Sequence, residues 1–458
     1  MNARLVIALL ASAGLSAQPA WSEDAVDLER AREILQQAPV VDGHNDLPWV
    51  IREKFGGDVE NYDISVRAQF DTDIPRLREG MVGTQFWSVY VPSSLSSLEA
   101  MQVQLEQINI AHRIISMYPD DLMLATSVAD IDAAFEQGRI ASLLGMEGGH
   151  TIVNSLGALR SYFDLGVRYM TLTHFHSNDW ADSATGDPRH EGITEFGREV
   201  VREMNRLGMM VDLSHVSAAT MNDVLDIAEA PVIFSHSSAR ALTDHARNVP
   251  DSVLQRVAEN GGVVMVTFVP PYVSDERRKW EDGMIPLLKD ATTDAEWDEV
   301  GRVYREENGI PPIATLSDVA DHIEHVARVA GEDHVGIGSD FYGATGDDLI
   351  EGLEDVSKFP DLIAELAGRG WSNEELSKLA RGNLLRAYAD VEKAAARLQQ
   401  SRPPSLKTIE ELDGFGRPDQ PQSEGSGGRH LPSGIERVQR RLYCQSHAVP
   451  SGNASHLR

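Results

Sequence analysis

The sequence predicts an α/β protein built on a (β/α)8 barrel of the TIM type. Eight short runs of apolar and β-branched residues alternate with longer helical patterns along most of the 458 residues. These runs are almost continuously apolar, which is typical of parallel strands that are buried on both faces. Their alternation with helices favours a closed barrel over a doubly wound sheet.

The predicted strands, in chain order, are residues 40–46, 82–91, 140–147, 167–174, 209–215, 231–236, 262–268 and 335–340. Helices are predicted between most of them, at residues 96–118, 153–165, 194–207, 218–228, 252–260 and 316–330. The longest interruption, at residues 270–312, is acidic, contains tryptophan and follows the seventh strand. Barrels of this type carry lids and substrate loops at the carboxyl ends of their strands, so we expect this segment to be one of these.

The two ends of the chain differ from its body. Residues 1–20 carry one positive charge followed by a short apolar stretch and small residues, which predicts a signal peptide and export to the periplasm or the medium. The apolar stretch is shorter than the ~20 residues that a membrane span needs. Residues 21–400 are predicted to form one catalytic domain. Residues 401–458 begin with a Pro-Pro break and become rich in Gly, Ser and Pro, so we expect a flexible C-terminal extension.

Composition excludes several classes of function. The chain has 41 basic and 71 acidic residues, and a formal net charge of −30 disfavours binding to nucleic acid or to anionic lipid. The single cysteine, Cys444, excludes an internal disulfide and a cysteine-ligated zinc site. A metal bound to this chain must therefore be held by His, Asp and Glu.

Seven ionisable side chains stand at the ends of predicted strands. They are His44, Asp46, Glu147, His174, His215, His236 and Asp340. In a barrel these ends meet at one mouth, where burial without compensation would cost each group several kcal/mol. Imidazole and carboxylate ligands suit zinc, with a weaker case for manganese, cobalt or iron. The number of groups is typical of two metal ions that share a bridging carboxylate and a bridging water.

Seven sequence motifs carry a family resemblance. They read VDGHNDLP from residue 41, GMEGGH from 145, GVRYMTLTH from 166, VDLSHVS from 211, PVIFSHSSAR from 231, RNVPD from 247 and HVGIGSDF from 334. With these motifs in this order, residues 39–388 resemble the renal (membrane) dipeptidase family, zinc metallopeptidases with an amidohydrolase-type barrel. The resemblance is to an exported member of bacterial type.

The resemblance implies a role for each group. One zinc ion would be bound by His44 and Asp46, a second by His215 and His236, and Glu147 would bridge the two. His174 would contact the scissile carbonyl, and Arg247 would hold the terminal carboxylate of the substrate. Asp340 would contact the substrate and carry the proton of a metal-bridging hydroxide. The implied reaction is hydrolysis of the peptide bond of dipeptides, with acceptance of a C-terminal D-residue left open.

Partners other than small dipeptides are not implied. The GPI anchor and the disulfide-linked dimer of the mammalian members have no counterpart in this sequence, whereas a noncovalent homodimer is compatible with it.

Two alternatives remain at this level. The first is another amidohydrolase-type reaction, such as N-acyl-amino-acid deacylation or lactone hydrolysis. Barrels of that kind commonly bridge their metals with a carboxylated lysine, but no lysine stands at a predicted strand end here. The second is a noncatalytic exported zinc-binding protein, which would be expected to lose Asp340 or Arg247, and both are present. We therefore expect an active dipeptidase.

Overall fold

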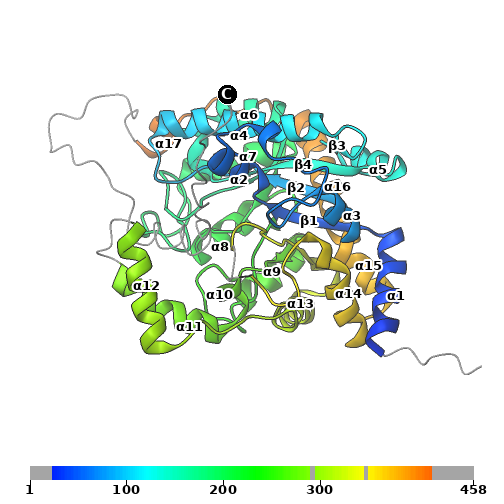
Figure 1. The fold of residues 1–458 in the computed structure, drawn as a ribbon. Helices are drawn as coiled ribbons and strands as arrows, with labels where there is room; N and C mark the ends of the chain where they lie inside the picture. Colours follow the sequence, from blue (N-terminus) through cyan, green and yellow to red (C-terminus); the bar gives the residue numbers. More distant parts are fainter. Residues whose placement is uncertain (1–22, 289–293, 345–348, 415–458) are drawn as a thin grey trace, which may run out of the picture.

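A closed barrel of eight parallel strands forms the centre of the molecule, and helices surround it (Figure 1). The computed structural model describes residues 23–288, 294–344 and 349–414. The barrel strands are β1 (Val40–Asn45), β2 (Val82–Ser88), β4 (Ile140–Glu147), β5 (Val167–Thr171), β6 (Met210–Asp212), β7 (Ile233–Phe234), β8 (Val263–Val266) and β9 (Val335–Ile337). Each pairs in parallel with the next, and β9 pairs with β1, so the predicted fold class and the eight predicted strands are confirmed.

A ninth strand, β3 (Leu122–Leu124), was not predicted from the sequence. It pairs with residues 140–142 of β4, while β5 pairs with residues 144–147 of the same strand. One edge of β4 pairs with β2, so β3 and β5 both pair with the other edge of β4, at different residues. Strand β3 therefore extends the sheet outside the barrel. Its three residues are too short to give a periodic apolar signal.

The six predicted helices are all present and surround the strands. They are α4 (Ser97–Met117), α6 (Leu156–Asp164), α7 (Glu195–Leu207), α8 (Ala218–Ile227), α9 (Asp251–Asn260) and α13 (Leu316–Ala330). Four of them begin where a Ser or Thr side chain accepts a hydrogen bond from a backbone N–H of the first turn, namely α6, α7, α8 and α13. Such caps satisfy donors that have no partner inside the helix.

Further helices complete the barrel wall and its two ends. They are α1 (Glu23–Gln37), α2 (Leu47–Phe55), α3 (Ile74–Glu79), α5 (Val128–Glu136), α14 (Phe359–Gly368), α15 (Asn373–Ser377) and α16 (Asn383–Ser401). Helix α1 packs against α14. Side chains of α16, including Tyr388, join the apolar cluster that fills the barrel interior together with Val41, Phe86 and Met265. The amino-terminal half of the barrel is therefore a packed core, which leaves the carboxyl ends of the strands for a site.

The described part of residues 270–312, the predicted lid or substrate loop, contains three helices, α10 (Pro270–Val273), α11 (Asp275–Met284) and α12 (Asp294–Asn308). In Figure 1, α11 and α12 project from one side of the barrel. They pack on each other through a small apolar cluster of their own that includes Met284, Trp297 and Tyr304. Among the described residues of this segment, Tyr272 of α10 lines the cavity at the barrel mouth.

The catalytic domain extends further than the sequence predicts. Helix α17 (Ile409–Asp413) lies against α7, and Ile409 is 2% exposed. The carboxylate of Asp413 accepts a hydrogen bond from the backbone N–H of Phe196 at 3.3 Å. The prediction of a flexible extension from residue 401 is therefore wrong as far as residue 414, because one buried isoleucine and a charged contact fix a segment whose composition is that of a loop. The predicted signal peptide and residues 415–458 lie outside the described residues.

None of the helices in the described ranges has the length and apolar character that a membrane crossing requires.

Candidate metal centre

The seven ionisable side chains predicted from strand ends come together at the carboxyl end of the barrel. Glu147 ends β4 and lies at the centre of the group. Its Oε2 lies 3.6 Å from Nε2 of His44, whereas its Oε1 lies 3.0 Å from Nε2 of His215 and 3.4 Å from Nε2 of His236. The two oxygens of one carboxylate thus face two different sets of ligand atoms.

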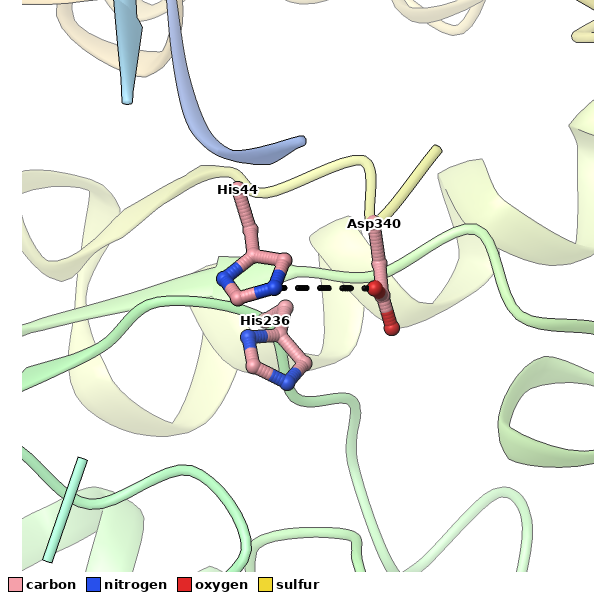
Figure 2. A group of neighbouring side chains, drawn as sticks. All are labelled: His44, His236 and Asp340. Carbon is pink, nitrogen blue, oxygen red and sulfur yellow. Dashed lines mark ion pairs between the residues drawn. The ribbon is translucent and has the colours of Figure 1, made fainter. Parts of the chain in front are cut away.

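The first set surrounds His44, the fifth residue of β1. Nε2 of His44 lies 3.4 Å from Oδ2 of Asp46 and 3.9 Å from Oδ1 of Asp340. Figure 2 shows the carboxylate of Asp340, in the turn after β9, beside the imidazoles of His44 and His236. Ligand atoms of His44, Asp46 and Glu147 all lie within 4.8 Å of one another, close enough to bind one ion.

The second set joins the turns after β6 and β7. Nε2 of His215 and Nε2 of His236 are 2.9 Å apart, and both face Oε1 of Glu147. His174, from the turn after β5, is also near, with its Nε2 3.8 Å from Oε1 of Glu147. Glu147, His215 and His236 form a second group whose ligand atoms lie within 4.8 Å of one another.

Electrostatics prepare the second set to bind a cation. Burial lowers the pKa of His215 well below its ordinary value, and the positive charge of Arg247 lowers it further. Burial, with His44 and Arg247 nearby, has the same effect on the pKa of His236. Both imidazoles are therefore neutral at pH 7, which is the form that binds metal.

The pKa values of two carboxylates, Glu147 and Asp340, are raised. Burial raises the pKa of Glu147, although the nearby His44 lowers it in part. Burial raises the pKa of Asp340 well above its ordinary value, and the charges of Asp46 and Glu147 contribute in the same direction. Three acidic groups share this buried space, so a bound cation would stabilise their ionised forms.

The donor atoms fit zinc. Nε2 of His44 and Oδ1 of Asp46 are buried, and neither has a hydrogen-bond partner among the described residues. Buried polar atoms normally have such a partner, so a bound ion would account for these two. Imidazole nitrogen and carboxylate oxygen are ligands that zinc commonly takes.

Two of the groups occupy strained backbone positions. His215 has a φ of +67° and Asp340 a φ of +62°, both in the left-handed region that side chains other than glycine rarely adopt. Each sits in the turn directly after a barrel strand. Strain of this kind concentrates at functional sites, where the surrounding structure holds it in place.

A cavity opens over the centre, and Arg247 lies in its wall. Arg247 is 1% exposed, and its guanidinium donates hydrogen bonds to Oγ of Ser237 at 3.3 Å and to the carbonyl oxygen of His236 at 3.2 Å. Its Cζ lies 5.2 Å from the ring centre of Tyr272 in α10. Its Nε has no hydrogen-bond partner among the described residues, so N–H capacity remains for an anionic ligand.

Aromatic side chains form much of the remaining wall, and the sequence did not identify them. They are Trp49, Tyr90, Phe175 and Tyr272. Phe175 directly follows His174, and Trp49 lies three residues after Asp46. This closeness to the ligand residues is the only sequence signal that could have indicated them.

The loop that carries Arg247 is held by buried polar contacts. The side-chain amide of Asn248 donates to the carbonyl oxygens of Thr243 and Tyr272, at 2.9 and 2.8 Å. His322, on α13, accepts a hydrogen bond from the backbone N–H of Ala239 at 2.9 Å, and its Nε2 donates to the carbonyl oxygen of Val273 at 3.2 Å. His322 thus ties this loop to α10.

Comparison with known families agrees with the motifs and the geometry. Residues 28–402 match the profile of the membrane dipeptidases, peptidase family M19. The chain belongs to this family. The match confirms the resemblance predicted from the sequence and the predicted enzyme class, a zinc-dependent dipeptidase.

Solved structures support the fold. The chain resembles the probable dipeptidase PvdM from Pseudomonas aeruginosa, with a TM-score of 0.71 and 24% identity over 81% of this chain and 100% of that one. An amidohydrolase from Pseudomonas aeruginosa is also similar, with a TM-score of 0.61 and 25% identity over 79% of this chain and 98% of the other. A metallopeptidase from Rhodobacter sphaeroides, liganded with a phosphinate mimic of the dipeptide L-Ala-D-Ala, is similar as well. Its TM-score is 0.63, with 24% identity over 77% of this chain and 99% of the other.

The first prediction concerns the contribution of buried His322, which holds the Arg247 loop, to the stability of the protein in acid. Burial lowers the pKa of His322 to about 4, below its ordinary value, so the unfolded chain binds more protons than the folded chain below pH ~6.5. Stability should therefore fall as pH decreases, and His322 should contribute about 2 kcal/mol of that loss between pH 7 and pH 5. Denaturant unfolding of wild type and His322→Gln at both pH values should show a shallower decline in the variant. An equal loss of unfolding free energy between pH 7 and pH 5 in wild type and variant would contradict the lowered pKa of His322.

Proposed function

We propose that this protein is an exported dipeptidase with two zinc ions per chain. His44 and Asp46 would hold one ion, His215 and His236 the other, and Glu147 would bridge them. The main support for the proposal is the position of the Glu147 carboxylate. Its Oε2 faces His44, while its Oε1 faces His215 and His236. One open zinc site needs three protein ligands, and two of the three groups of described residues that could hold an ion here, His44–Asp46–Glu147 and Glu147–His215–His236, share a carboxylate.

The bound ions would polarise the scissile carbonyl and lower the pKa of the attacking water. The residues of the chain would carry out the remaining steps. Asp340 lies 3.9 Å from Nε2 of His44 and borders the cavity, so it can take the proton of the attacking water and donate it to the leaving amine. Burial raises the pKa of Asp340 above its ordinary value, which helps this carboxylate to hold the proton between the two transfers.

His174 and Arg247 would position the substrate between them. Nε2 of His174 lies at the cavity beside Glu147, where an N–H donor can stabilise negative charge that develops on the carbonyl oxygen. Arg247 offers a planar fork that matches a free α-carboxylate. Arg247 and Glu147 line the same cavity, so a buried cation here favours a substrate whose terminal carboxylate is close to the scissile bond, which is a dipeptide.

Acceptance of a C-terminal D-residue is part of the proposal. The Rhodobacter sphaeroides metallopeptidase that shares this fold was solved with a mimic of L-Ala-D-Ala. The carboxylate clamp leaves the configuration of the adjacent carbon open, because it recognises the charge and not the side chain. Export rests on residues 1–20, whose charge and short apolar stretch are typical of a signal peptide.

Replacement of Asp340 tests the chemical step. Zinc-loaded wild type should hydrolyse L-Ala-L-Ala, and Asp340→Asn should reduce kcat by roughly 10²–10⁴ because it removes the proton carrier. Metal content, measured by atomic emission, should stay near that of wild type, since the ligands that we assign to both ions remain. Near-normal turnover with normal zinc content would assign the proton transfer to another group.

Replacement of Arg247 tests substrate recognition. Arg247→Met keeps the volume of the side chain and removes its charge, so the preference for L-Ala-L-Ala and L-Ala-D-Ala over their C-terminal amides should disappear. The loss in kcat/KM for the free acids should be about 2–5 kcal/mol, as expected for a buried charge pair.

Arg206 supplies a matched control for Arg247. It is also buried, at 7% exposure, but it pairs with Glu203 on α7, away from the cavity. Arg206→Met should keep the preference for the free acid over the amide. The clamp would be refuted if Arg247→Met kept the wild-type preference as well.

A further inference from the structure

A tyrosine hydroxyl inside the barrel reaches one of the metal ligands from a different strand. Tyr169, on β5, is fully buried, and its Oη lies 2.8 Å from Nδ1 of His44 on β1. The same hydroxyl donates a hydrogen bond to the carbonyl oxygen of Gly43 at 3.1 Å. Because the phenol has a single proton and gives it to Gly43, its oxygen must accept the bond from His44.

The space for this contact is built into the neighbouring strand. Gly145 lies on β4, two residues before Glu147, and the ring of Tyr169 passes over it. A Cβ at Gly145 would lie 2.0 Å from Cζ and 2.3 Å from Oη of Tyr169. Only glycine at this position lets the phenol cross the barrel to His44.

The direction of the hydrogen bond decides which nitrogen of His44 is a ligand. If Nδ1 carries the proton, Nε2 has a free lone pair, and Nε2 is the atom that faces Asp46 and Glu147. We propose that Tyr169 is a positioning residue that holds His44 in the Nδ1–H tautomer and so sets the affinity of the metal site formed with Asp46. This inference rests on the proposed binuclear function.

The second metal site is held by a different set of groups. Nδ1 of His236 lies 2.8 Å from Oγ of Ser235, and that hydroxyl donates to Oδ2 of Asp212 at 2.5 Å. Ser235 therefore accepts from His236 as Tyr169 accepts from His44. The hydroxyl of Tyr169, which bonds to Gly43, and that of Ser235, which bonds to Asp212, have no partner in common. Removing one hydroxyl should therefore weaken one metal site and spare the other.

The test measures zinc affinity rather than turnover. In Tyr169→Phe, competition with a chromogenic chelator should show that one of the two zinc sites binds 10–100-fold more weakly, the usual cost of removing such a support. Ser235→Ala should weaken one site to a similar extent, and the double variant should weaken both. The His215→Ala background, which lacks a ligand of the second site, identifies the affected ion, because Tyr169→Phe should still weaken the zinc that remains.

Tyr388 provides a matched control. It is a buried tyrosine, 1% exposed, whose hydroxyl donates to the carbonyl oxygen of Thr126 at 2.7 Å, and neither residue belongs to the candidate metal centre. Tyr388→Phe should keep both zinc affinities, so loss of a buried tyrosine hydroxyl alone cannot explain a change in Tyr169→Phe.

Two results would overturn the inference. One is unchanged affinity at both sites in Tyr169→Phe. The other, which does not require the variant to fold, is a ¹⁵N-histidine NMR spectrum of the zinc-loaded wild type that shows His44 protonated on Nε2. A wild type that binds fewer than two zinc ions would refute the proposed function itself. The zinc content of the wild type is therefore measured before any variant is compared.

Discussion

The burial of Glu147 among imidazoles and other carboxylates is the constraint on which the rest of the site depends. Its side chain is almost fully buried, within 3.0–3.8 Å of nitrogens from His44, His174, His215 and His236. Burial of an ionised carboxylate costs several kcal/mol unless charge and hydrogen bonds compensate it. The neutral imidazoles of His215 and His236 do not supply that charge, but divalent cations do. The family, the donor atoms and the electrostatics therefore all indicate that this group of side chains binds metal.

The barrel satisfies this constraint by geometry. The proposed ligand residues come from β1 and the residue after it, from β4 and from the turns after β6 and β7, so none is near all of the others in the sequence. The packed amino-terminal half of the barrel fixes the strands, and buried side chains such as Asp42 hold the turns. Asp42 accepts hydrogen bonds from the backbone N–H and the hydroxyl of Ser339, both at 2.7 Å, immediately before Asp340. A stable scaffold can thus support strained turns at its mouth.

Much of the fold and most of the site could be predicted because both leave local signals. Parallel barrel strands give continuous apolar runs, and the proposed ligands stand where those runs end. The missed features depend on contacts between distant residues. Tyr169 contacts His44, which is 125 positions away in the sequence, and Ile409 is buried in a helix that packs against α7. The aromatic wall was missed for the same reason, since Trp49 and Tyr90 have no periodicity that marks a cavity.

The most direct test of a shared carboxylate is a crystal structure of the zinc-loaded protein with data collected on both sides of the zinc absorption edge. The account predicts two anomalous peaks in each chain, one beside Oε2 of Glu147 with His44 and Asp46, and one beside Oε1 with His215 and His236. A single peak, or two peaks of which one does not contact Glu147, would contradict it.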